Sequence, residues 1–284
     1  MRSLILAVPL LLVAPGVAGA AVTPGDYGGG AVKGRGGPGH LRTGTVWIWA
    51  RVAPDGRARI GGAAHVACGL TRFDAEVTLA PDGSFRFSRI RTARQFGHRL
   101  RAVVTVRGRF DGAAASGAVR GRPRNRHPNG VVRRCSTHGA RAWQLRMPAA
   151  AGAPAPTQPG ATYHGLTSQQ GNVPRPFLLA VARSGARVKA TIFEYKVGCA
   201  KLSYESNDVS RGARIRPDGT FVVRESFAFR SPRLVERVRV RVAGGFSPGH
   251  ASGTIRVHSV VRARGSGRVV DRCDTGQLTF NAQL

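Results

Sequence analysis

The chain has 284 residues and a formal net charge of +30, with 44 lysine and arginine residues against 14 aspartate and glutamate residues. This length allows more than one domain with a core of its own, and the scarcity of acids leaves few groups for acid-base catalysis. Beyond the first twenty residues, no stretch is long and apolar enough for a transmembrane helix, which takes about 20 residues.

Residues 1–20 have the pattern of a signal peptide. Arg2 supplies a basic start, an apolar stretch occupies 4–13, and AGA at 18–20 is a small-residue cleavage site. We therefore expect an exported protein that is secreted or associated with the cell envelope. The next distinctive segment, GGGAVKGRGGPG at 28–39, is rich in glycine and is expected to form a mobile loop.

Two later segments alternate between apolar residues and arginine. RLRAVVTVRGRF at 99–110 and VERVRVRVAGGF at 235–246 both have period two, so that in the second Val240 should be buried and Arg239 exposed. Turn sequences such as PDG recur at short intervals, and no segment has a helical stripe with caps. The pattern predicts an all-β chain of two tandem antiparallel β-sandwich or β-barrel domains with about eight strands each.

The domain organisation follows from an internal repeat. HVACG at 65–69 corresponds to KVGCA at 196–200, APDGSFRF at 80–87 to RPDGTFVV at 216–223, and GRFDGAAASGAVR at 108–120 to GGFSPGHASGTIR at 244–256. We expect a first β-domain at 21–147 and a second at 161–284. The linker at 148–160, PAAAGAPAPTQPG, is expected to be an extended spacer of up to about 40 Å.

Arginines gather in the hairpin before the last strand of each copy. These hairpins are AVRGRPRNRHPNGVVRR at 118–134 and VRARGSGRVVDR at 261–272. Guanidinium groups bind phosphate and carboxylate in bidentate geometry, so both hairpins are candidate polyanion sites. The candidate residues are Arg120, Arg122, Arg124, Arg126, Arg133, Arg134, Arg262, Arg264, Arg268 and Arg272.

The cysteines Cys68, Cys135, Cys199 and Cys273 are separated by 67, 64 and 74 residues. Such distances are unlike the close pairs of zinc ligands, so no metal site is expected. In an exported protein the cysteines should form disulfides, and four cysteines allow three pairings. Because each copy holds one early and one late cysteine, we expect Cys68 to pair with Cys135 and Cys199 with Cys273.

The second copy combines TYHGLTSQ at 162–169, Cys199, PDGTF at 217–221, GGFSPGHASGTIRV at 244–257 and CDTG at 273–276. In this combination it resembles an uncharacterised secreted all-β domain of high-GC bacteria. There, a Tyr-x-Gly-x-Thr-Ser-Gln opening strand and a Cys-Asp-Thr-Gly closing strand recur. The first copy lacks Thr-Ser-Gln and has CSTHG in place of CDTG. The resemblance implies secretion and an all-β fold, and it transfers no catalytic residue.

Few residues could support catalysis. Glu194, Glu205 and Asp208 could supply a glycosidase pair, which needs two carboxylates facing one cleft. The chain has no Gly-x-Ser-x-Gly, no His-Glu-x-x-His and no phosphate-binding Gly-x-x-x-x-Gly-Lys. We therefore expect no catalytic residue and no cofactor, with an extracellular polysaccharide hydrolase as the alternative.

The expected partner is an anionic cell-wall polymer or another extracellular polyanion, such as anionic lipid or shed DNA. Specific nucleic-acid binding is not expected, because the basic hairpins contain no aromatic residue on which a base could stack. A GC-rich genome that favours arginine codons is an alternative source of the charge. The sequence thus favours a secreted, non-enzymatic binding or structural module at the cell envelope.

Overall fold

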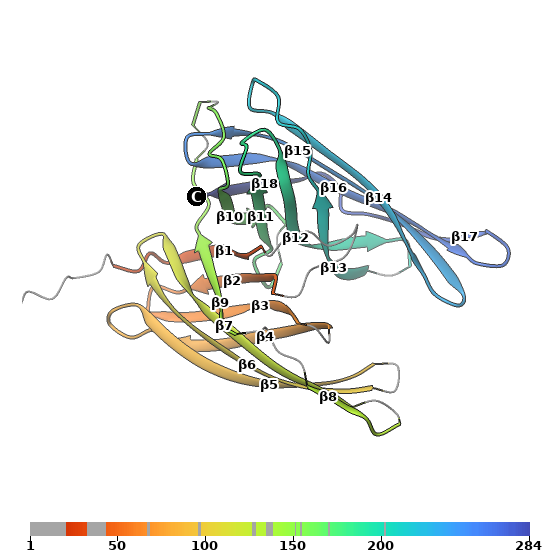
Figure 1. The fold of residues 1–284 in the computed structure, drawn as a ribbon, viewed down its shortest axis with the longest axis horizontal. Coiled ribbons are helices and arrows are strands. Elements are labelled where there is room, and N and C mark those ends of the chain that lie inside the picture. The colour runs from red at the N-terminus through yellow and green to blue at the C-terminus, as the bar shows by residue number, and fades with distance from the viewer. Residues whose placement is uncertain are drawn as a thin grey trace, which may run out of the picture.

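The computed structural model describes residues 21–32, 44–66, 69–95, 98–126, 129–134, 139–150, 152–153, 155–169, 171–201 and 203–284. The regular elements within these ranges are all strands, and none of the described segments is a helix long and apolar enough to cross a bilayer. The strands form two antiparallel sheets, which confirms the predicted fold class (Figure 1). The predicted signal peptide at 1–20 lies outside the described residues.

The first sheet has nine strands in the order β4-β3-β2-β1-β9-β7-β6-β5, and the short β8 pairs with β7. Its strands are β1 (Gly25–Ala31), β2 (Val46–Val52), β3 (Arg57–Val66), β4 (Gly69–Thr78), β5 (Ser84–Gln95), β6 (His98–Asp111), β7 (Ala114–Arg126), β8 (Val132–Arg134) and β9 (Arg141–Arg146). The two ends of this order, β4 and β5, follow each other in the chain across a PDG turn. The sheet is therefore curled so that its two edges approach each other.

The second sheet also has nine strands, and it repeats the same order as β13-β12-β11-β10-β18-β16-β15-β14. Its strands are β10 (Thr162–Thr167), β11 (Pro176–Val181), β12 (Val188–Cys199), β13 (Ser203–Arg211), β14 (Phe221–Arg230), β15 (Leu234–Ser247), β16 (His250–Ala263), β17 (Val269–Asp274) and β18 (Leu278–Gln283). Each strand thus has a counterpart at the same place in the first sheet. We call the two sheets, with their turns, the first and second units.

A disulfide fastens the second unit where its sheet closes. The short β17 pairs with both β16 and β12, so β12, β11, β10, β18, β16 and β17 form a closed ring of hydrogen-bonded strands. Cys199 on β12 lies opposite Cys273 on β17, with 4.0 Å between their Cα atoms, and their sulfurs are bonded. The predicted Cys199–Cys273 disulfide is thus confirmed. Cys68 and Cys135 lie outside the described residues, so the other predicted bridge stays a prediction.

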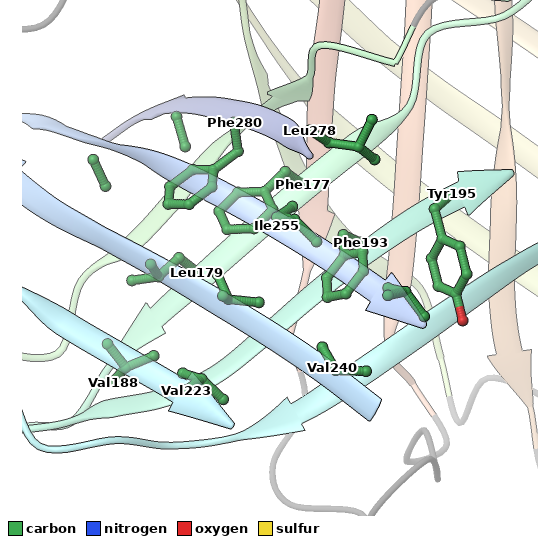
Figure 2. Close-up of a cluster of buried hydrophobic side chains, with 14 of the residues drawn as sticks. Phe177, Leu179, Val188, Phe193, Tyr195, Val223, Val240, Ile255, Leu278 and Phe280 are labelled. Carbon is green, nitrogen blue, oxygen red and sulfur yellow. The ribbon is translucent and has the colours of Figure 1, made fainter. Parts of the chain in front are cut away.

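Aromatic and aliphatic side chains on the inner faces of the strands fill the second unit (Figure 2). Phe177 on β11 and Phe280 on β18 stack with their ring centres 4.1 Å apart. On β15, Val240 is 3% exposed whereas the neighbouring Arg239 is exposed, as the period-two pattern predicted. Burial of alternate residues on each strand supplies the main favourable term in the folding of such a sheet.

The first unit has a separate core, and its first strand is anchored there by a tyrosine. Tyr27 is fully buried against Phe110, and its hydroxyl donates a hydrogen bond to the carbonyl oxygen of Gly112 at 2.8 Å. Desolvation of this hydroxyl raises the pKa of Tyr27 to about 12. The contact ties β1 to the turn between β6 and β7.

The glycine-rich segment was expected to be a mobile loop, and this is wrong for residues 28–31, which belong to β1. β1 pairs with β2 on one side and β9 on the other, so it is a central strand. Glycine is needed there because the strand touches the second unit. A Cβ added to Gly28 would lie 2.1 Å from the carbonyl oxygen of Gly165, and one added to Gly29 would lie 2.9 Å from Cβ of His164.

The two units pack mainly through β1, β2 and β9 of the first unit and β10 and β11 of the second, and an apolar cluster extends the contact to β3 and β12. Trp47 on β2 is buried in a small apolar cluster with Leu178 on β11 and Ile192 on β12. Trp47 therefore fills the interface between the two units. Figure 1 shows β1 and β10 side by side at this junction.

The linker at 148–160 does not hold the units apart. Ala149 donates its N–H to Oδ1 of Asn281 at 3.2 Å, Ala155 donates to the carbonyl oxygen of Phe246 at 3.0 Å, and Thr157 donates to that of Gly185 at 2.9 Å. The expectation of an extended spacer is therefore wrong. Composition alone favours an extended chain, but here the segment follows the surface of the second unit and its backbone groups are bonded to it.

Replacing Gly28 by Ala should disrupt the junction, because the new methyl group cannot lie 2.1 Å from a carbonyl oxygen. We expect the free energy of unfolding to fall by about 1–3 kcal/mol, as for other overpacked sites. Urea unfolding followed by tryptophan fluorescence measures this change. Gly265→Ala is the control, since a Cβ there meets nothing within 4 Å and should leave the midpoint unchanged; equal midpoints for both variants would contradict the close packing.

Stability should also fall as the pH drops below about 6.5, because His164 is buried at the junction. Desolvation, and to a smaller extent the charge of Arg146, lower the pKa of His164 from 6.5 to about 4. The unfolded chain therefore binds a proton that the folded chain does not, and between these pH values up to about 3 kcal/mol is lost. Urea titrations at pH 7 and pH 4.5 should show this loss, and His164→Gln should show a smaller one.

Candidate anion-binding surfaces

Five of the six predicted basic residues of the first copy lie on one face. Arg120, Arg122, Arg124 and Arg126 are exposed on β7, where buried or half-buried residues alternate with them. The antiparallel β8 places Arg134 opposite Arg124. Arg133 lies opposite Asn125, and its side chain is outside the described residues.

The structure adds arginines from two further strands to this face. Arg86 on β5 lies opposite Arg107 on β6, and Arg101 on β6 lies opposite Arg124 on β7. The sequence pattern placed the β6 arginines on a solvent face, but it contained no signal that joined them to the hairpin. We call this surface the first basic face, which comprises Arg86, Arg101, Arg107, Arg120, Arg122, Arg124, Arg126 and Arg134.

A shallow hollow of about 360 Å³ lies in the first basic face. Arg86, Arg107, Arg120 and Arg122 line it, with Thr105 between them. Within the described part of the chain, no ion pair involves any of these four arginines. Strands β5 to β8 carry a single acid, Asp111, at the end of β6.

The arginines on the opposite side of the first unit are paired. Arg51 binds Asp26, Arg57 binds Asp55, Arg59 binds Asp74 and Arg72 binds Glu194, each at 2.7 Å. Acids thus pair with arginines of β1–β4, whereas none of the four arginines that line the hollow on β5–β7 has such a partner within the described ranges. Like charges directly opposite each other on neighbouring strands are destabilising, so the rows Arg86–Arg107 and Arg101–Arg124 cost stability in the free protein.

The second unit has a basic face at the corresponding place, on β14–β17. Its exposed arginines alternate with core residues, and Arg241 lies between Arg224 on β14 and Arg256 on β16. We call this surface the second basic face, which comprises Arg224, Arg237, Arg239, Arg241, Arg256, Arg262 and Arg272. The predicted Arg264 and Arg268 are exposed in the turn between β16 and β17.

The second basic face also contains a hollow, of about 510 Å³, lined by arginines 224, 239, 241 and 256 and by His258. The internal repeat brings six lining positions of one hollow onto six of the other. These pairs are Val103 and Arg239, Thr105 and Arg241, Ala118 and Thr254, Val119 and Ile255, Arg120 and Arg256, and Arg122 and His258. The two hollows therefore occupy the same place on the fold.

Two acids distinguish the second basic face: Glu225 lines its hollow, and Asp274 pairs with one of its arginines. Asp274, from the CDTG sequence, accepts a hydrogen bond from Nη2 of Arg256 at 2.8 Å, and Gly276 donates its N–H to the same carboxylate at 2.7 Å. Chiefly because of the Arg256 hydrogen bonds, the pKa of Asp274 lies below its usual range. Arg256 is therefore partly neutralised, whereas its counterpart Arg120 is not.

The candidate glycosidase residues Glu194 and Glu205 line one cavity between the two units. Arg175 stands between them: its Nη1 is 4.0 Å from Glu194, and its Nη2 donates to Glu205. The hydrogen bond from Arg175 lowers the pKa of Glu205. A general acid of a glycosidase needs a raised pKa instead, so this pairing opposes that role. The side chain of Asp208 lies outside the described residues.

Cys199, Asp271 and Cys273 form the one described group whose ligand atoms are close enough for a metal. Both sulfurs belong to the disulfide, and a carboxylate oxygen of Asp271 accepts the N–H of Ala200 at 2.9 Å. A cysteine binds a metal ion as the free thiolate, which a disulfide-bonded sulfur cannot supply. These three residues therefore form a structural bridge and a backbone cap.

No known protein family, curated protein or solved structure matches this chain. The resemblance to a secreted all-β domain of high-GC bacteria accordingly stays a prediction. The all-β fold and the Cys199–Cys273 disulfide are compatible with an extracellular protein.

Proposed function

We propose that this protein is a secreted, non-enzymatic module that binds an anionic polymer of the cell envelope through its two basic faces. The observation that carries the proposal is the recurrence of an arginine-lined hollow at equivalent positions of the two units. An isolated patch of charge has many origins. An arginine-lined hollow on equivalent strands of both copies indicates that this surface has a function.

The electrostatics of the free protein support an anionic partner. On both faces arginines lie opposite arginines, as in the pairs Arg86–Arg107 and Arg224–Arg241. A phosphate or carboxylate bound between the guanidinium groups of such a pair replaces the repulsion between the two arginines by charge-assisted hydrogen bonds. A polymer that carries such groups at regular spacing could occupy both faces of one molecule, and the second contact would then form at a high effective concentration.

Codon preference explains the number of arginines better than it explains their placement. It gives no reason for ion pairs to concentrate on β1–β4 while β5–β8 hold one acid. The alternative function, hydrolysis of a polysaccharide, draws support from two glutamates in one cavity, and it is opposed by the pairing of both with Arg175.

Removing the four arginines of the first hollow tests the proposal. The variant Arg86→Gln, Arg107→Gln, Arg120→Gln and Arg122→Gln should bind polyglycerol phosphate and polygalacturonate at least about tenfold more weakly at low salt. Its affinity should also depend less steeply on salt, since fewer counterions are released. Its stability should not fall, because the variant loses unfavourable charge pairs. Titration calorimetry at several salt concentrations measures the first two effects.

The matched control removes four exposed arginines that line neither hollow: Arg183, Arg187, Arg214 and Arg216, all in segments that connect strands of the second unit. Both variants lose the same net charge. If both lose affinity equally, the polymer responds to total charge and the hollows are no site. If the intact protein binds neither polymer at about 0.15 M salt, where exposed charges are screened beyond about 8 Å, the binding proposal fails. Preference for anionic vesicles or DNA would point to another polyanion.

A further inference from the structure

The hairpin between β14 and β15 ends in an exposed apolar tip. Figure 1 shows this hairpin projecting from the body of the second unit. Phe229 near the end of β14 is 49% exposed, and Leu234 at the start of β15 is 39% exposed. We call residues 229–234 the hairpin tip. Exposed apolar side chains that lie together mark interaction sites, whereas scattered ones are normal on any protein surface.

Phe229 and Leu234 belong to one face of the hairpin. Phe229 pairs with Glu236, and Leu234 lies two residues before Glu236, so both apolar side chains point to the same face of the sheet. Further along β14 this face fills the core, where Phe221 is buried. Phe227 lies between them: it is half-buried, and its ring centre is 5.3 Å from that of Phe229. The apolar face of β14 therefore continues beyond the core into solvent.

Hydrogen bonds order the hairpin tip. Ser231 donates its N–H to the carbonyl oxygen of Leu234 at 2.9 Å, and Leu234 donates its N–H to Oγ of Ser231 at 3.0 Å. Pro232 restricts the backbone of the turn. Arg264, in the turn after β16, donates its N–H to the carbonyl oxygen of Arg233 at 2.9 Å, so the two neighbouring turns are joined. A tip that is ordered before it binds loses little conformational entropy on binding.

The charge around the hairpin tip is positive. Residues 226–235 and 261–270, which comprise the tip, the neighbouring turn and the adjacent strand ends, contain no aspartate or glutamate. They contain five arginines, all exposed: Arg230, Arg233, Arg262, Arg264 and Arg268. The flanking acids Glu236 and Asp271 are bonded within the unit, to the hydroxyl of Tyr204 and to the N–H of Ala200. An apolar tip is thus combined with an excess of cations.

We propose that the hairpin tip inserts into the surface of an anionic lipid bilayer. Phe229 and Leu234 enter the boundary between the headgroups and the acyl chains, while the long arginine side chains keep their guanidinium groups among the lipid phosphates. The distance from Phe229 to the turn is about three residues, or about 10 Å of strand, and interfacial segments reach a depth of about 5–10 Å. Glu236, opposite Phe229, marks the limit of insertion.

Lipid fits the hairpin tip better than other extracellular partners do. A polymer of phosphates or uronic acids has no apolar interior that Phe229 and Leu234 could enter. A stable protein interface uses about 20–30 residues on each side, far more than residues 229–234 supply. Arginines near an anionic bilayer add electrostatic attraction to the apolar contact. The inference goes beyond the proposed polymer binding, because no residue of the tip lines either hollow.

Vesicles of phosphatidylglycerol and phosphatidylcholine are the probe. In cosedimentation at about 0.15 M salt, the double variant Phe229→Ser, Leu234→Ser should bind them at least about tenfold more weakly than the intact protein, because two apolar side chains no longer leave water. It should bind polyglycerol phosphate as the intact protein does. Ile90→Ser is the control: it removes an apolar side chain that is 57% exposed in the middle of β5, and it should bind the vesicles normally.

Fluorescence quenching tests insertion directly. Phe229→Trp should be quenched by the same vesicles made with brominated acyl chains, and Ile90→Trp should not. The native Trp47, Trp49 and Trp143 are at most 5% exposed and lie in the first unit, so they should contribute no quenching.

Three results would each overturn the inference: no binding of the vesicles to the intact protein, equal binding by the Phe229→Ser, Leu234→Ser variant, or no quenching of Phe229→Trp. A dimer of the intact protein in sedimentation velocity that this double variant loses would also overturn it, since the tip would then contact a second copy. Quenching that persists when the four arginines of the first hollow are replaced, while polymer binding is lost, would support two separate sites.

Discussion

The rest of the structure depends on the backbone contact between β1 and β10. Gly28 and Gly29 allow β1 to approach the second unit until their missing side chains would overlap Gly165 and His164. The contact is reciprocal, because the internal repeat makes Gly28 the counterpart of His164 and Gly29 that of Gly165.

This packing decides which surfaces remain available. Since β1 and β2 pack against β10 and β11, the buried Trp47, the Arg72–Glu194 ion pair and the cavity lined by Glu194 and Glu205 all lie between the units. The outer faces of β5–β8 and β14–β17 are left to solvent, and they carry the arginines of the two basic faces, of which Arg256 is paired with Asp274 (Figure 1). At the junction the buried Glu194 is paired with Arg72, because a buried charge needs a partner, whereas acids are scarce on β5–β8, where an external anion could supply one.

The sequence predicted what local patterns control. Alternation predicted the strands and the burial of Val240, and the repeat predicted the Cys199–Cys273 bridge. The junction could not be predicted, because glycines that allow close approach look like those of a loop, and the linker composition favours extension. The basic hairpins were visible as runs of arginine, but Arg86 joins them only through strand pairing. Likewise Glu194 and Glu205 suggested a cleft, and only the structure showed that Arg175 holds both.

The central claim, that the two copies form one cooperative body, can be tested with probes that each copy carries by itself. The three tryptophans lie in the first copy, and Cys199 and Cys273 lie in the second. During urea unfolding with a reductant and a thiol label, tryptophan fluorescence reports the first copy, and labelling of Cys199 and Cys273, located by peptide mass mapping, reports the second. A shared junction predicts coincident midpoints, as in a two-state transition. Two well-separated midpoints would show that the copies unfold independently and would contradict the account.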